Sequence, residues 1–492
     1  MERSLQLQPK LMRRFYEVLV LLRVLSQVQG AKLCGDTLEE GGFDHLGAME
    51  MRRKTMYHLC VMCDYLKGGD TVTAIASENI PCGPRYWIAA NDHLEKIKCF
   101  LIEVLKMLET QVEMEAYNSE LHVFEQRLFA KFVSFQKARI KQYWKLLQPH
   151  VETELKRIAL SPEPRDNASE YREWLRAFKS PLTTLDSYSQ FSQLAYDKRR
   201  SRFLRVAYDP ITMEAVTMES GPRKDIRHYV GRLCAPRRAA TLLTYAAANH
   251  PALFEGSSVQ CHSSGSTSKP PAARGGLTLE GISARMFPNG SPALLEFRGA
   301  LQSLDSKGSI LARVLSQYQD QKWRPRVHAE LALLEVLHER KCSFYDNDKY
   351  IACSKAACFC CYHYICGHQG TFTRPPSHNK IYLNWEPPDV RGQARYSEQR
   401  NIMNGLTVQV RQAVIEKVLN AHRSIKWHPD SSTGITPSVV FLSESEVSPD
   451  LARQSSSMSG SSRASSQGSQ SSAGSESHES EDCEDGGVSL VQ

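Results

Sequence analysis

The sequence predicts an α+β protein with a helical first part, a mixed section of strands and helices, and a polar tail. Through most of residues 1–205, apolar side chains recur every three or four positions, as on one face of a helix. Between residues 324 and 388, short apolar runs typical of strands alternate with helix-like segments. From residue 430 onward, Ser, Gly and Glu dominate, and such a sequence buries too little apolar surface to offset its chain entropy. We therefore expect residues 430–492 to be disordered.

The composition excludes several classes of protein. The 492 residues are 41% hydrophobic and 23% charged, which is ordinary for a globular chain. No apolar run is long enough to span a bilayer, and we find no secretory signal at the start. We therefore expect an intracellular protein of the cytoplasm or nucleus, with no membrane contact, whose 14 cysteines stay reduced. Reduced cysteines serve metal binding or catalysis more often than disulfide formation.

The helical pattern continues on both sides of the mixed section. In the first part it predicts an all-helical N-terminal region, residues 1–205, whose helix faces would bind a protein partner. The expected helices cover residues 11–28, 48–66, 91–112, 121–159, 224–250, 291–304, 310–318 and 400–422. Residues 257–276 are of low complexity and are predicted to form a flexible insert.

Positive charge is concentrated ahead of the tail. Residues 430–492 hold ten acidic and only two basic residues, a net charge of −8. Because the whole chain carries +7, the preceding 429 residues carry +15. A basic body favours a polyanionic partner such as nucleic acid. Basic clusters at residues 197–202 and 237–238 would suit phosphate contacts, and a solvated helix face explains them equally well.

The residues that suggest chemistry lie between residues 328 and 366. Six of the 14 cysteines fall between Cys342 and Cys366, which is too dense for core filling alone. His328 and Glu330 stand where a short predicted strand becomes a helix, so both side chains can face one pocket. Further on, a second strand leads into a helix that begins with Ser354, Lys355 and the C-x-x-C pair.

Two of these cysteines have the spacing of metal ligands. Cys358 and Cys361 are three positions apart near the start of the second helix, whose positive N-terminus favours thiolates. One histidine and two cysteines leave a fourth zinc position for water, as in catalytic sites. A nearby carboxylate that does not bind the metal can then transfer protons to and from that water.

At these residues the sequence resembles the zinc-dependent nucleotide and nucleic-acid deaminase superfamily, whose signature is H-x-E followed by P-C-x-x-C. Here Ala357 stands in the position of the proline. It is most similar to a fungal branch of deaminase-like proteins related to bacterial toxin deaminases. The resemblance extends roughly over residues 224–388. Its motifs are His328-Ala329-Glu330, Ser354-Lys355 with Cys358 and Cys361, and the segment from Ser377 to Trp385.

The resemblance implies a fold and a reaction. It implies a three-layer α/β/α, cytidine-deaminase-like domain over residues 224–425 that hydrolytically deaminates cytosine or adenine, in nucleic acid or as a free nucleotide. Zinc would be bound by His328, Cys358 and Cys361, and Glu330 would be the general acid and base.

The resemblance also implies contacts with the base. Residues 380–385 would form the next strand of the sheet. Asn384 and Trp385 in this strand, together with Ser354, would contact the substrate.

Two alternatives use the same residue types differently. In the first, Cys358 and Cys361 form a structural zinc module without His328, in a non-catalytic adaptor that binds proteins. Its other ligands would come from Cys353, Cys366, His363 or His368.

The second concerns His58, Cys60 and Cys63, which also show H-x-C-x-x-C spacing. Because they lie in an apolar helical run, we expect them to be buried core residues.

Overall fold

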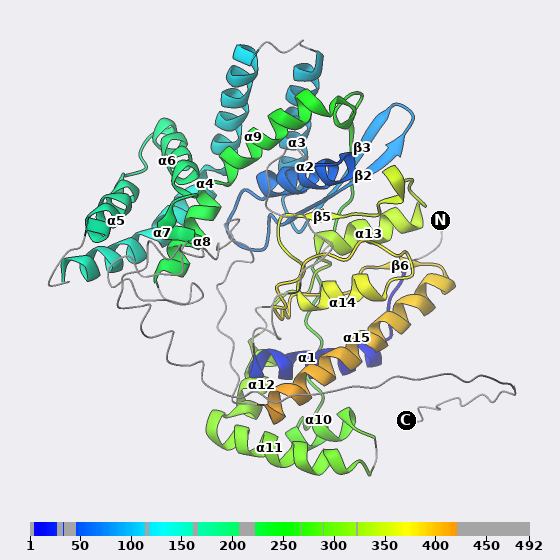
Figure 1. Ribbon diagram of the computed structural model, residues 1–492. Coiled ribbons are helices and arrows are strands. Elements are labelled where there is room, and N and C mark those ends of the chain that lie inside the picture. Colours follow the sequence, from blue (N-terminus) through cyan, green and yellow to red (C-terminus); the bar gives the residue numbers. More distant parts are fainter. Residues whose placement is uncertain are drawn as a thin grey trace, which may run out of the picture. The chain divides into compact units, whose positions relative to one another are not determined.

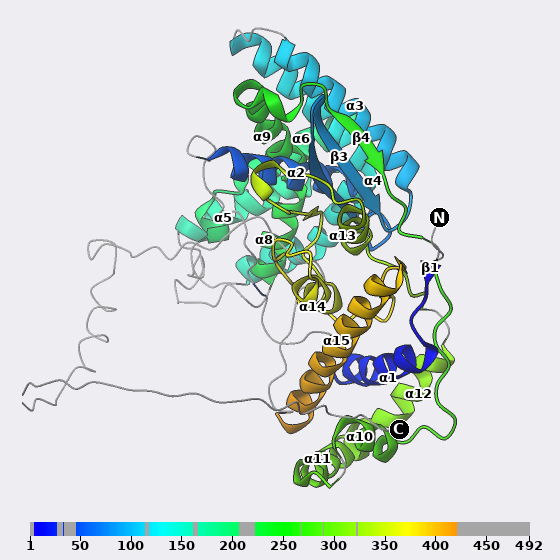
Figure 2. The same ribbon diagram turned by 90° about the vertical axis from the view of Figure 1, so that its right-hand side faces the viewer.

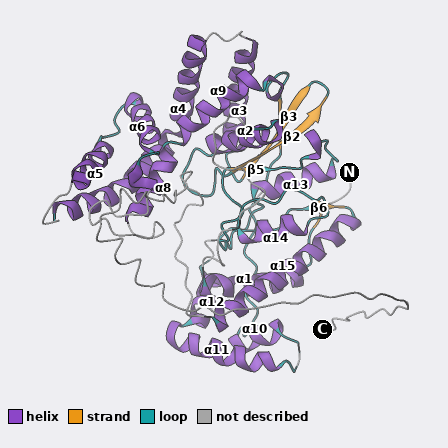
Figure 3. Cartoon of the chain, in the orientation of Figure 1, coloured by secondary structure: helices purple, strands orange, loops and turns teal. Residues whose placement is uncertain are grey.

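The protein is an α+β chain in which helices surround a small mixed sheet (Figures 1 and 3). The computed structural model describes residues 4–26, 33, 46–113, 118–160, 166–205, 222–265, 267–288, 290–320 and 323–420. These residues belong to one compact unit, Met1–Val439. The tail predicted to be disordered, residues 430–492, lies outside the described residues.

The helices begin and end close to where the hydrophobic periodicity placed them. Two predictions differ more. The segment predicted as a single helix over residues 224–250 is divided at Cys234, because Pro236 lies in the first turn of a new helix. The helix predicted over residues 400–422 begins seven residues earlier, at Gln393. The helices are α1 (Pro9–Leu25), α2 (Ala48–Cys63), α3 (Leu94–Glu113), α4 (Asn118–Ala159), α5 (Asp166–Arg176), α6 (Leu185–Lys198), α7 (Arg202–Arg205), α8 (Pro222–Leu233), α9 (Ala235–Asn249), α10 (Leu279–Met286), α11 (Pro292–Gly308), α12 (Ile310–Gln319), α13 (Ala329–Glu339), α14 (Phe359–Gly367) and α15 (Gln393–Leu419).

The main sheet is built from segments that are far apart in the sequence. Its strands are β2 (Thr73–Ile80), β3 (Gly83–Ala90), β4 (Ser258–Cys261) and β5 (Ala352–Cys353), in the order β4-β3-β2-β5. β2 pairs antiparallel with both β3 and β5, whereas β3 and β4 are parallel. A separate antiparallel pair joins β1 (Ser4–Leu5) to β6 (Val390–Arg391).

The prediction of an all-helical N-terminal region is wrong, because β2 and β3 form a hairpin within it. Thr73 pairs with Ala90, and the register continues to Ile80 opposite Gly83. Residues 81 and 82 therefore form the turn between the two strands. Residues 73–77 of β2 and residues 86–90 of β3 are buried on both faces of the sheet. They therefore lack the apolar–polar alternation that identifies a half-buried strand.

The predicted flexible insert also contains ordered structure. Its residues 258–261 form β4, which lies along β3 at the edge of the sheet. Ser264 extends the contact, since its hydroxyl donates to the Ala90 carbonyl at 2.6 Å. Polar side chains on an edge strand remain partly exposed while the backbone pairs, so this strand has no hydrophobic signature.

The side chains of the two central strands separate two hydrophobic cores. Ile75, Tyr86 and Ile88 enter the core formed with α2, α3, α4 and α9. Ala74 and Trp87 enter the other core, formed with α1, α13, α14 and α15. Helices therefore cover both faces of the sheet, with α2 and α9 on one side and α13 and α14 on the other (Figure 1).

The sheet connects the two regions that the sequence suggested were separate. Helix α13 contacts β2 and β3, and β5 extends β2 on its free side. In the core that includes Trp87, α1 crosses α15 (Figure 2), so residues from both ends of the described chain contact each other. The predicted boundary, between residues 205 and 224, falls mostly outside the described residues and stays a prediction.

No helix in the described ranges combines the length and hydrophobicity needed to cross a membrane.

The H-x-C-x-x-C sequence of α2 is part of the core, as expected. Cys60 and Cys63 are fully buried, and burial raises the pKa of both thiols above the usual range. Burial, with the positive charges of Arg238 and Lys54, lowers the pKa of His58 to about 3. His58 is therefore a neutral core side chain at neutral pH.

This burial predicts a loss of stability in acid. The unfolded chain binds a proton at His58 below pH 6.5, but the folded chain does not do so until about pH 3. The free energy of unfolding should therefore fall as the pH decreases through this interval. We expect His58→Leu to reduce this dependence, measured as urea midpoints between about pH 7.5 and about pH 5. His122→Leu, at an exposed position on α4, is the control; an equal dependence in both variants would contradict the prediction.

Candidate metal and catalytic site

Three side chains that the sequence proposed as metal ligands come together in the structure. The Nδ1 atom of His328 lies 3.7 Å from the Cys358 sulfur and 3.3 Å from the Cys361 sulfur. The ligand atoms of the three residues all lie within 4.8 Å of one another. Within the described ranges, this is the one group of three or more His, Cys, Asp or Glu side chains close enough to hold a metal ion.

The backbone positions His328 at the start of α13. His328 is the N-cap residue, with an extended conformation (φ −75°, ψ 149°), and its carbonyl accepts the first bonds of the helix. The next amide, that of Ala329, donates to the Asn91 side chain at 2.9 Å, directly after β3. The hairpin therefore holds the start of α13 in place, with the histidine side chain directed toward α14.

Cys358 has the same place at the start of α14. It is the N-cap residue, and its sulfur accepts a hydrogen bond from the Cys361 amide at 3.4 Å. Such a cap satisfies one free amide of the first turn and brings a thiolate to the positive end of the helix. The C-x-x-C spacing thus places both sulfurs at the helix start, although Cys358 precedes the helix rather than lying within it.

The donor set and its spacing fit a tetrahedral metal ion. Zinc binds sulfur at about 2.3 Å and imidazole nitrogen at about 2.05 Å, so the two donor atoms of a tetrahedral site lie about 3.6 Å apart. The two nitrogen–sulfur distances in the structure, 3.3 and 3.7 Å, bracket this value. Three protein donors leave one position for a water molecule or substrate.

Electrostatics favour an anionic sulfur in this cluster. Burial opposes ionisation of Cys358, but a hydrogen bond from Cys361 and the charge of His328 lower the pKa of the Cys358 thiol well below its usual range. Burial and the Cys358 sulfur raise the pKa of Cys361. A metal ion would therefore meet one thiolate and displace a proton from the other sulfur.

Glu330 lies beside this cluster and is buried. Only 6% of its surface is exposed, and its Oε2 atom lies 4.0 Å from the Cys353 sulfur. Burial is the largest influence on the pKa of Glu330 and raises it, whereas the charge of His328 lowers it and that of Cys358 raises it. A buried carboxyl whose pKa is raised is suited to accept and return a proton.

Of the three predicted substrate contacts, only Trp385 touches the cluster, and it does so from the core. Its ring is fully buried, and its indole nitrogen donates to the Cys361 sulfur at 3.3 Å. The Ser354 hydroxyl accepts from the Thr73 amide at 3.2 Å and so extends the β2–β5 pairing. Asn384 is exposed, and its side-chain oxygen accepts from the Arg324 amide at 2.7 Å.

The segment that holds Trp385 does not form the expected strand. Residues 380–385 do not join the four-stranded sheet, and Trp385 makes an isolated parallel bridge with Arg326. Ile381, Leu383 and Trp385 are nevertheless buried and the two residues between them are exposed, although the backbone bends at Leu383 and Asn384. The backbone contacts of this segment go to the start of α14, where the Phe359 amide donates to the Lys380 carbonyl at 3.1 Å, and to Arg326, whose amide donates to the Asn384 carbonyl at 3.2 Å.

A buried polar network joins the helices that carry the ligands. The Tyr364 hydroxyl on α14 donates to Glu335 on α13 at 2.7 Å. Arg395 on α15 forms ion pairs with Glu335 and with Glu398. Burial would raise the pKa of Glu335, but hydrogen bonding by His368 and the charge of Arg395 lower it. The network therefore contains an ionised carboxylate whose partners come from α14, α15 and the loop after α14.

The alternative structural zinc module does not assemble in the described residues. Its proposed ligand His368 is engaged by Arg395 and Glu335, and the His363 ring packs against Phe359. Cys366 is exposed, and Cys353 approaches Glu330 instead. The metal group that does assemble includes His328.

Two residues near the site were not recognised from the sequence. Asn91, which holds the Ala329 amide, follows a strand that the helical interpretation concealed. Tyr382, whose ring centroid lies 6.3 Å from that of His328, belongs to the alternating segment described above. The alternation of buried and exposed residues places Tyr382 on the exposed side. The same alternation of residue types in the sequence could have pointed to Tyr382.

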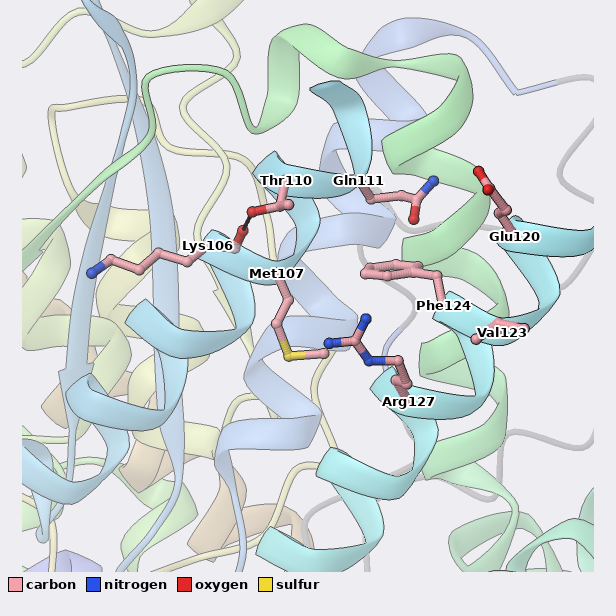
Figure 4. A pocket seen from close by; sticks show the side chains of 8 residues that line it. All are labelled: Lys106, Met107, Thr110, Gln111, Glu120, Val123, Phe124 and Arg127. Carbon is pink, nitrogen blue, oxygen red and sulfur yellow. Dashed lines mark hydrogen bonds between the residues drawn. The ribbon is translucent and has the colours of Figure 1, made fainter. Parts of the chain in front are cut away.

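Two cavities in the described part of the chain are separate from this cluster. A cavity of about 470 Å³ lies between α3 and α4 and is lined by Lys106, Met107, Thr110, Gln111, Glu120, Val123, Phe124 and Arg127 (Figure 4). A second, of about 380 Å³, lies between α1 and α12. Neither is lined by a residue of the candidate site.

The first prediction concerns metal content. Because His328 supplies one of only three donors, we expect the full-length protein to hold one zinc ion and His328→Ala to lose it, as measured by elemental analysis. His363→Ala is the control, since this histidine lies near Cys358 but packs against Phe359. Retention of zinc by His328→Ala would mean that other groups bind it.

The second prediction concerns the indole of Trp385. Removing its hydrogen bond to Cys361 with Trp385→Phe should weaken zinc binding by roughly 10- to 100-fold, measured by competition with a chelator. Trp323→Phe is a matched control, because the Trp323 indole lies in the same core and donates to the Gln317 carbonyl instead. Equal zinc affinities in the two variants would show that the indole does not support the ligand.

Comparison with known proteins identifies the segment that carries this site. No curated protein and no solved structure matches the chain. Residues 327–389, which contain His328, Glu330, Cys358 and Cys361, match the family model described as OTT_1508-like deaminase. The predicted resemblance to deaminases is thus confirmed over this segment, and residues 327–389 are similar to a deaminase family.

Proposed function

We propose that this protein is a zinc-dependent hydrolytic deaminase of a nucleobase, cytosine or adenine. The observation that carries the proposal is the position of Glu330, a buried carboxyl beside a cluster of one histidine and two cysteines. The match of residues 327–389 to a deaminase family supports the same reaction class. We further propose zinc as the metal, since two sulfurs and one imidazole form a donor set that zinc prefers.

The residues of the chain divide the reaction between them. Zinc, when bound, would supply the Lewis acid that makes a water molecule nucleophilic at neutral pH. Glu330 Oε2 accepts a proton from this water as its oxygen bonds to the amino-bearing carbon of the base. Glu330 then gives this proton to the amino group, the carbon–nitrogen bond breaks, and ammonia leaves. The second proton of the water ends on the adjacent ring nitrogen, so the ring carbon keeps a carbonyl oxygen. His328, Cys358 and Cys361 would hold the metal.

The proposed substrate is a base in nucleic acid or in a free nucleotide. A base within a duplex cannot reach a buried carboxyl, so a polymeric substrate must present it unpaired or flipped. The net charge of +15 on residues 1–429 would attract a phosphate backbone. We also propose an intracellular location and kinship with the fungal branch of deaminases. The N-terminal helices remain a proposed surface for a protein partner.

Substitution of Glu330 tests the reaction directly. We expect Glu330→Gln to lower kcat by roughly a hundred- to ten-thousand-fold while zinc stays bound, because the amide cannot transfer the proton. Activity is measured as ammonia release from cytidine, adenosine and single-stranded oligonucleotides. Glu339→Gln, at a half-exposed position on the same helix, is the matched control. If the wild-type protein deaminates none of these substrates, the adaptor interpretation replaces the enzyme.

A polymeric substrate makes its own prediction. Binding of single-stranded RNA or DNA should weaken as salt increases, with a log–log slope of roughly −0.7 for each phosphate contact. Fluorescence anisotropy over a series of salt concentrations measures this slope. Binding that is independent of salt would rule out the phosphate backbone as the main contact and would favour a free base or nucleoside.

A further inference from the structure

The smaller of the two cavities carries mostly hydrogen-bond donors. It lies between α1 and α12, which pack side by side (Figures 1 and 2), and has a volume of about 380 Å³. The residues that line it are Arg23, Val24, Ala312, Arg313, Ser316 and Gln317. Two guanidinium groups, one hydroxyl and one amide thus line the cavity, and its described lining contains no carboxylate.

Most of these donors have no partner within the described ranges. Arg313 donates one hydrogen bond, to the Val24 carbonyl at 2.8 Å, and its other guanidinium nitrogens have no partner there. Arg23 is half-buried, yet it forms neither a hydrogen bond nor an ion pair with the residues that the structure describes. The side chains of Ser316 and Gln317 form none either. A half-buried cation without a partner costs free energy, because it loses water and gains no opposite charge.

The cavity is net positive even though two helix ends meet at it. Arg23 and Val24 lie in the last turn of α1. Ser316 and Gln317 lie in the last turn of α12. The C-terminal end of a helix carries roughly half a negative charge, so the two ends together contribute about −1. Two guanidinium groups outweigh this and leave an excess of about one positive charge, which favours an anion.

This cavity lies next to the proposed catalytic site. Burial lowers the pKa of the Arg23 guanidinium and interaction with the Tyr382 hydroxyl raises it, so Arg23 and Tyr382 are neighbours. The centroid of the Tyr382 ring in turn lies 6.3 Å from that of His328. A nucleotide carries its phosphate one sugar away from the base. A phosphate subsite must therefore lie beside the base site, as this cavity lies beside His328.

The donor set of the cavity suits a phosphate group. The planar guanidinium group of arginine matches two phosphate oxygens at once, and arginine is favoured wherever phosphates are recognised. Hydroxyl and amide side chains such as those of Ser316 and Gln317 also donate to phosphate oxygens. A nucleobase substrate brings a phosphate with it when the base belongs to a nucleotide or to a strand.

We propose that the cavity between α1 and α12 binds a phosphate group of the substrate, with Arg23 and Arg313 as the residues that contact it. The inference rests on the proposed deaminase function and narrows its substrate class. The substrate is then a phosphorylated nucleotide or a nucleic acid, and a free base or nucleoside binds less tightly. The phosphate comes from a free nucleotide or from the backbone of a strand, and both present the same oxygens.

Binding to the full-length, zinc-loaded protein tests the proposal without relying on turnover. In the Glu330→Gln background, which keeps a bound substrate intact, calorimetry would compare cytidine and adenosine with their monophosphates. The monophosphates should bind more tightly than the nucleosides. Arg23→Gln and Arg313→Gln should each raise the Kd of the monophosphates by roughly 5- to 50-fold, because a hydrogen bond to a charged group is lost. Neither substitution should change the Kd of the nucleosides.

Two further variants separate phosphate binding from effects on the fold. Ser316→Asp places a carboxylate at an exposed position of the cavity whose hydroxyl has no partner among the described residues. It should weaken phosphate binding by charge repulsion, even if Arg313→Gln destabilises the end of α1. Arg176→Gln, on α5, changes the net charge equally but lies outside the cavity, and should bind every probe as its parent does. Zinc content and Tm are measured for each variant.

Labelled single-stranded RNA and DNA distinguish the two sources of the phosphate. If the phosphate belongs to a free nucleotide, strands bind no more tightly than monophosphates, and the arginine substitutions weaken the monophosphates. If it belongs to a strand, strands bind more tightly, and each arginine substitution flattens the log–log salt slope by roughly 0.7. Either result supports the proposal.

The outcomes also separate this proposal from the function on which it rests. If Arg23→Gln, Arg313→Gln and Ser316→Asp all bind monophosphates and strands as the parent does, the cavity binds no phosphate, and deamination by the wild-type protein still stands. If these variants weaken phosphate binding but the wild-type protein deaminates none of the probes, the cavity is an anion site and the deaminase function fails. If the wild-type protein neither binds nor deaminates any probe, both proposals fail.

Discussion

The candidate site depends on the meeting of two helix starts. His328 and Cys358 are both N-cap residues with extended backbones, and each begins a helix whose first turn points toward the other. At such positions the side chain lies beside free amides and the positive end of the helix dipole, which favours an anionic sulfur. If either helix were displaced by one turn along its axis, His328 and Cys358 would no longer lie side by side.

The sheet and a buried ion network keep the two helix starts together. β2 pairs with β5, which leads into α14, and the residue after β3 holds the first amide of α13. On the other side of the helices, Glu335 joins α13 to Tyr364 of α14 and to Arg395 of α15. Removing one partner from such a buried pair leaves an uncompensated charge, so this arrangement resists small displacements of either helix.

Burial also separates the chemical roles of the residues around the site. Glu330 lies in a buried environment that raises its pKa, whereas Glu335, one and a half turns later on α13, is held ionised by Arg395 and His368. One carboxyl is therefore suited to proton transfer and the other to holding structure. The indole of Trp385 supports the Cys361 sulfur from the core, and Tyr382, three residues earlier, remains at the surface.

The sequence by itself determined most of the helices and the three residues of the candidate metal-binding group, and the tertiary structure decided how they combine. Helices such as α3 and α4 could be predicted because their apolar periodicity depends only on local geometry. The ligands could be proposed because C-x-x-C at a helix start is also local. The hairpin β2–β3 and the edge strand β4 escaped prediction because their pairing partners are distant, and because burial on both faces or exposure at an edge removes the alternating pattern. For the same reason, only the folded chain shows that Asn91 supports His328 and that Tyr382 lies beside it, since such contacts join residues with no fixed spacing in the sequence.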